Sequence, residues 1–69
     1  MTQKELLYLE DAIGHENNIV QICEETANSL HNDDLIAFIN EQKEEHVLLK
    51  NALMNMLKEK ANEWSITNG

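Results

Sequence analysis

Apolar residues recur at alternating spacings of three and four from the start of the chain to residue 30. Residues three and four apart lie on the same side of an α-helix, so this repeat predicts one face of a long helix. Its members are Leu6, Leu9, Ile13, Glu16, Val20, Cys23, Ala27 and Leu30. Glu16 is the one polar member. Thr2 and Glu5 fit a capping box just before the repeat, so we predict a first helix over about residues 3–31.

A second repeat with the same spacing follows the short polar segment 31–34, which reads His-Asn-Asp-Asp. Either Asn32 or Asp33 can cap a second helix there, and acidic side chains favour its positive N-terminal end. The members of the second repeat are Leu35, Ile39, Gln42, His46, Leu49, Leu53 and Met56. This repeat is therefore apolar at both ends and polar in the middle.

The connection between the two predicted helices is short enough to force an antiparallel hairpin. We expect the second helix to cover about residues 34–62 and the domain to span 1–64, with Trp64 docking against a neighbouring helix. Residues 65–69 are expected to form a frayed tail. The chain contains no proline and only two glycines, so nothing divides it into short strands. Gly14 costs the first helix about 1 kcal/mol relative to alanine. The predicted fold class is all-α.

Both helices carry further apolar or small side chains beside the main repeats, which gives each helix a broad face. These are Ala12, Ile19 and Thr26 on the first helix and Ile36, Phe38, Ala52 and Leu57 on the second. A chain of 69 residues buries little apolar surface on its own. We therefore predict that two hairpins pair into a four-helix bundle, a homodimer at least. A regulatory hairpin that inserts into another protein's bundle is the alternative use of the same face.

The charge of the chain makes some classes of binding partner unfavourable. Five basic and thirteen acidic residues give a net charge of −8, which repels nucleic acid and anionic lipid headgroups. The sequence has neither an apolar run of about 18 residues nor a secretory leader, so we expect an intracellular protein. The single cysteine, Cys23, has no partner for an internal disulfide and is expected to be a small buried thiol.

The polar residues in the middle of the two repeats are the candidate site. At about 1.5 Å rise per residue, Glu16 and His46 lie within about one helical turn of the same level in the hairpin. A two-fold dimer would bring two of each together, and carboxylate and imidazole ligands suit iron, manganese or zinc. Metal-carboxylate bundles carry a glutamate three residues before the histidine, but Lys43 stands there.

Two interpretations of this layer remain open. In the first, the Lys43 ammonium lies beside Glu16, and a structural polar layer forms in the interior. Its expected members are Glu16, Gln42, Lys43, Glu45 and His46. In the second, Glu16 and His46 from two chains bind a metal ion, with Glu44 or Glu45 supplying the missing ligand. His15 is expected on the outer face and His31 in the turn, and no residue is predicted to be catalytic.

The chain also resembles a known family of proteins. It reads Lys4-Glu5-Leu6-Leu7-Tyr8-Leu9-Glu10-Asp11-Ala12-Ile13 near its start, and further matching positions are Glu16, Ala27, Leu30, Asp34, Leu35, His46, Leu49 and Leu53. With these residues it resembles ferritin-like hairpins, and most closely the small coat-F-type proteins of spore-forming bacteria. Rubrerythrin-like proteins are a more distant resemblance.

The resemblance implies a ferritin-like four-helix bundle built from two hairpins. In the metal-bearing members of that superfamily it also implies a di-iron centre with ferroxidase or peroxidase-type activity. Only Glu16 and His46 match that ligand pattern, and Lys43 replaces the glutamate of the second helix. We therefore expect a non-enzymatic, self-associating protein of the spore or its coat, with other coat proteins as partners. A metal-binding protein is the alternative.

Overall fold

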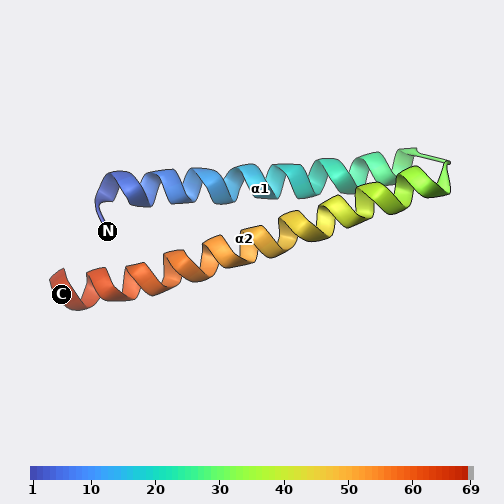
Figure 1. Cartoon of the computed structure of the whole chain (residues 1–69). Helices are drawn as coiled ribbons and strands as arrows, with labels where there is room; N and C mark the ends of the chain where they lie inside the picture. The colour runs from blue at the N-terminus through green and yellow to red at the C-terminus, as the bar shows by residue number, and fades with distance from the viewer. Residues whose placement is uncertain (69) are drawn as a thin grey trace.

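A computed structural model describes the backbone of residues 1–68 and the side chains of residues 1–60 (Figure 1). It contains two helices, α1 (Gln3–Ser29) and α2 (Asp33–Asn68), and no strand within that range. The two helices run antiparallel, and they diverge from the turn toward the chain ends. The hairpin measures 53 × 15 × 12 Å. The prediction of an all-α hairpin is confirmed.

The predicted capping box begins α1. The backbone N–H of Glu5 donates to Thr2 Oγ1 at 3.1 Å, and the backbone N–H of Thr2 donates to Glu5 Oε1 at 2.8 Å. The hydrogen bond from the Thr2 backbone favours the ionised carboxylate and lowers the pKa of Glu5 below its ordinary value. At the other end, α1 stops at Ser29, because Leu30 adopts an extended conformation.

Asn32 is the residue that caps α2. Its side-chain Oδ1 accepts from the backbone N–H of Leu35 at 3.1 Å, and this bond satisfies one of the free donors at the helix start. The helix then continues to Asn68, past the end expected near residue 62, and takes in residues 65–68 of the predicted tail. The side chain of Trp64 lies outside the described residues, so its docking stays a prediction.

The face of α1 that packs on α2 is the predicted one. All eight members of the first repeat are at least partly shielded, and Cys23, with 9% of its surface exposed, is the most buried. Cys23 is the only buried side chain among residues 1–60, and none of them is completely shielded from water. A hairpin with one buried side chain has a very thin core.

The face of α2 that packs on α1 differs from the prediction. Besides Gln42 and Val47, the partly shielded residues form a repeat at alternating spacings of three and four: Ile36, Ile39, Lys43, His46, Lys50, Leu53 and Leu57. Leu35, Leu49 and Met56, which we expected in the core, are about half exposed. The predicted repeat therefore joined members of two adjacent faces of α2, because both faces have the same spacing.

Two further features concern individual segments. A Cβ atom added at Gly14 would meet no other atom within 4 Å, so no close approach between helices requires this glycine. Over the part of α1 and α2 that the structure describes, neither helix has a stretch long and apolar enough to cross a membrane.

Candidate functional site

Glu16 and His46 form a direct contact between the two helices at mid-height of the hairpin. His46 Nδ1 lies 2.5 Å from Glu16 Oε2, and the two side chains are 30% and 13% exposed. A carboxylate only accepts, so the imidazole N–H is the donor when Glu16 is ionised. The prediction that these two residues meet is confirmed. We call this pair the polar waist.

Lys43 does not join the polar waist. Its Nζ atom pairs instead with Glu24 Oε1 at 3.7 Å, about two turns along α1 from Glu16, and both side chains are accessible to water. The expected Glu-Lys-His network is therefore replaced by two separate pairs. Glu45, which we also placed in the interior layer, is exposed, and Gln42 is partly exposed.

The polar waist of one chain does not fit a bound metal as it stands. Two ligands at about 2.1 Å from a tetrahedral metal would lie about 3.4 Å apart, which is longer than the direct contact between Glu16 and His46. Within the described residues, no group of three histidine, cysteine, aspartate or glutamate side chains is arranged to hold a metal ion. A metal site would need side chains from a second chain, as the sequence already indicated.

A second face of the hairpin carries apolar side chains that are exposed. On α1 it comprises Tyr8, Ala12, His15, Ile19, Ile22 and Thr26, and on α2 it comprises Leu35, Phe38, Gln42, Glu45, Leu49, Ala52 and Met56. We call this set the docking face. Its members follow the same alternating spacing of three and four as the residues that pack inside the hairpin. Tyr8, Ile22 and Phe38 are each more than half exposed.

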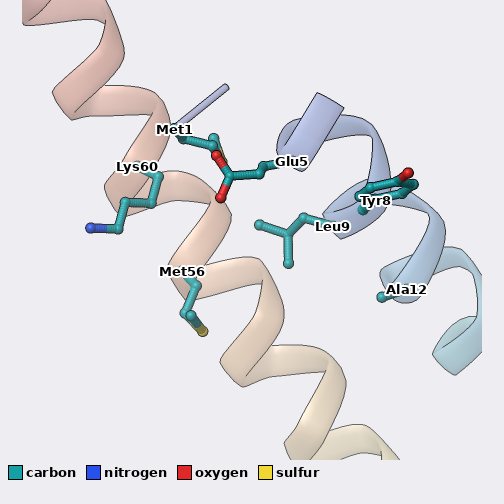
Figure 2. Close-up of a pocket in the computed structure, with 7 residues that line it drawn as sticks. All are labelled: Met1, Glu5, Tyr8, Leu9, Ala12, Met56 and Lys60. Atoms are coloured by element: carbon teal, nitrogen blue, oxygen red, sulfur yellow. The ribbon is translucent and has the colours of Figure 1, made fainter. Parts of the chain in front are cut away.

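The two halves of the docking face lie on the same side of the hairpin. On both helices each docking residue directly precedes a residue of the inner face, and successive residues are about 100° apart around a helix. The docking residues of both helices therefore lie about 90° to 100° from the inner face, in the same rotational direction about the helix axis. In an antiparallel pair, this places both apolar stripes on one side. A groove of about 570 Å³ between the helices is lined by members of both stripes, Tyr8 and Ala12 from α1 and Met56 from α2. Figure 2 shows Leu9 projecting from α1 into this groove.

The spacing of apolar residues predicts parts of the docking face but does not mark it as a separate face. Ile19 and Phe38 were interpreted as a widening of one stripe, and His15 was placed on the outer surface. The signal was present in the sequence, because residues 35, 38, 42, 45, 49, 52 and 56 form a complete repeat of their own. The structure separates the two faces, because Ile36 and Leu57 are partly shielded whereas the preceding residues Leu35 and Met56 are exposed.

Comparisons of the chain with protein-family models, with curated proteins and with solved structures found no match. The resemblance to coat-F-type and other ferritin-like proteins stays a prediction, carried by the residues quoted for it above.

Proposed function

We propose that this protein is a non-enzymatic, self-associating hairpin whose docking face pairs with that of a second copy to form a four-helix bundle. The observation that carries the proposal is the docking face itself, a mainly apolar and largely exposed repeat that continues from Tyr8 to Thr26 on α1 and from Leu35 to Met56 on α2. Repeats with this spacing are typical of helices that pack against other helices.

The surface area of the hairpin supports the same proposal. A compact monomer of 8.0 kDa is expected to expose about 4,450 Å², whereas this hairpin exposes 5387 Å². The hairpin therefore exposes more surface than a compact monomer of its mass, which favours the covering of one face by a partner.

Two neighbouring leucines of α2 allow a matched test. Leu49 belongs to the docking face and is 46% exposed, whereas Leu48 lies about 100° away around the helix and is 65% exposed. We expect Leu49→Glu to convert the dimer into a monomer in sedimentation equilibrium and Leu48→Glu to leave it intact. Equal behaviour of the two variants, or a folded monomeric wild type at micromolar concentration, would rule out this face as the interface.

The place of this assembly in the cell follows from the resemblance. A coat-type protein with no catalytic residues acts as a structural component, and we propose that the dimer belongs to the spore or its coat. A fluorescent fusion followed through growth and sporulation tests this part. Even production during vegetative growth, with no signal in purified spores, would remove the coat assignment while leaving the dimer untouched.

Metal binding is the second candidate, and the convergence of Glu16 and His46 is the observation that favours it. It would require the waists of two chains to meet, with iron, manganese or zinc ligated by both. Metal analysis of protein purified without chelators decides between the candidates. A stoichiometric metal that is lost in His46→Ala would establish the site, and trace metal unaffected by that change would exclude it.

A further inference from the structure

Three polar residues interrupt the docking face near its middle. His15 lies on α1, and Gln42 and Glu45 lie on α2. The contact between Glu16 and His46 fixes how the two helices are aligned, so the level of residue 15 corresponds to residue 47 on α2. His15 and Glu45 are therefore only about 3 Å apart in height, at a rise of about 1.5 Å per residue. Both side chains are exposed.

A two-fold dimer through this face has two arrangements. With the hairpin turns at opposite ends, each helix packs on its own copy. Glu45 lies at the centre of the stripe from Leu35 to Met56, so full overlap would bring the two Glu45 carboxylates together at the symmetry axis. Burying two like charges side by side is unfavourable.

With the turns at the same end, each α1 packs on the α2 of the second copy. The residues of α1 then lie at the same levels along that α2 as they do along the α2 of their own hairpin. His15 then faces Glu45 of the second copy within less than one helical turn, and an imidazole N–H can donate to that carboxylate. Tyr8 reaches the level between Ala52 and Met56, and Ile22 reaches the level between Phe38 and Gln42. The charge pattern therefore distinguishes the two arrangements and favours this one.

We infer that the dimer has both hairpin turns at the same end and that reciprocal hydrogen bonds between His15 and Glu45 of the two copies select this arrangement. The inference rests on the proposed function, and it assigns to His15 and Glu45 the role of determining orientation. The hydrogen bonds form twice per dimer because of the two-fold symmetry.

Paramagnetic labels at the turn measure the orientation directly. His31 is exposed in the turn, so a His31→Cys variant in a Cys23→Ala background carries one label per chain. We expect a label-to-label distance of about 10 to 20 Å. Opposite turns would instead separate the labels by about 40 Å, the length of α1 at about 1.5 Å per residue. A dimer with the long distance would overturn the inferred orientation and leave the proposed self-association standing, whereas a monomer in sedimentation would overturn both.

A charge exchange provides a second test that needs no label. We expect Glu45→His to raise the dimer dissociation constant about tenfold, because each histidine then faces another histidine. His15→Glu is expected to have a similar effect, and the double variant should restore wild-type affinity within about threefold. Glu44→His, next to Glu45 but off the docking face, is the matched control. Tighter association of Glu45→His would contradict the inference. In the arrangement with the turns at opposite ends, the two Glu45 carboxylates meet, so that change would remove their repulsion.

Discussion

Replacing the polar waist by leucine tests how Glu16 and His46 contribute to stability. Both residues occupy positions of the packed repeats where the other members of α1 are apolar or small, and they are 13% and 30% exposed. We predict that the double variant Glu16→Leu/His46→Leu is more stable than the wild type. Replacement of a shielded polar pair by well-packed apolar residues is often neutral or stabilising.

The expected magnitude follows from the burial of the two positions. Full burial of one leucine is worth about 1.5 to 3 kcal/mol, so two leucines at these shielded positions contribute about 2.5 to 4.5 kcal/mol. The hydrogen bond that is lost involves a charged group and is worth about 1.5 to 3 kcal/mol before the exposure of His46 is taken into account. The balance lies between about zero and a gain of about 3 kcal/mol in the free energy of unfolding, and the exposure of His46 moves it toward the gain.

Urea unfolding followed by circular dichroism measures this gain. All variants are compared at one protein concentration, because association contributes to apparent stability. The two single variants complete a double-mutant cycle, in which we expect a coupling energy of about 1 to 2 kcal/mol between Glu16 and His46. Glu44→Leu, at an exposed position, controls for the general effect of an added leucine. A double variant that is less stable than the wild type would refute the reasoning.

Other predictions concern single positions. Gly14→Ala should raise the free energy of unfolding by about 1 kcal/mol, because the new Cβ meets open space, and an unchanged midpoint in urea would contradict this. Thr2→Ala should lower it by about 1 kcal/mol through loss of the cap, measured in the same assay. The pKa of Glu5 is lowered in the folded state, so the stabilisation by its ionised carboxylate is present above the ordinary pKa of glutamate and is lost as the pH falls through the lowered value. The stability difference between Glu5→Gln and wild type should therefore shrink on acid titration. Replacing Lys43 by methionine should cost less than about 1 kcal/mol, and high salt should remove the part due to Glu24.

The sequence predicts the elements of this fold well but not the orientation of α2. The capping box at Thr2 and the polar break before α2 mark the helix starts, since both depend on local chemistry. The meeting of Glu16 with His46 follows from chain length and helix rise alone. The rotation of α2 about its axis depends on which of two equivalent repeats meets α1, and spacing does not distinguish them.

Lysines on the inner face of α2 make the rotation of this helix about its axis harder to predict. Lys43 and Lys50 are partly shielded between the helices, at positions where the sequence pattern favours apolar residues. A lysine can lay its methylene stem along apolar surface while its ammonium reaches water. For Lys43 the ammonium reaches Glu24 at the surface. The long lysine side chains can therefore occupy an inner face of α2 at positions where hydrophobicity alone predicts apolar residues.

In the proposed dimer, the thin core around Cys23 would link the stability of this protein to its abundance. When most of the apolar surface becomes covered only on pairing, each tenfold dilution of the chain removes about 1.4 kcal/mol from the stability of the assembled form. In a homodimer the unpaired fraction is largest at low abundance, so chains made in small amounts would be the ones that unfold and meet proteases first. The proposed assembly would therefore be most stable in cells that make the chain in quantity.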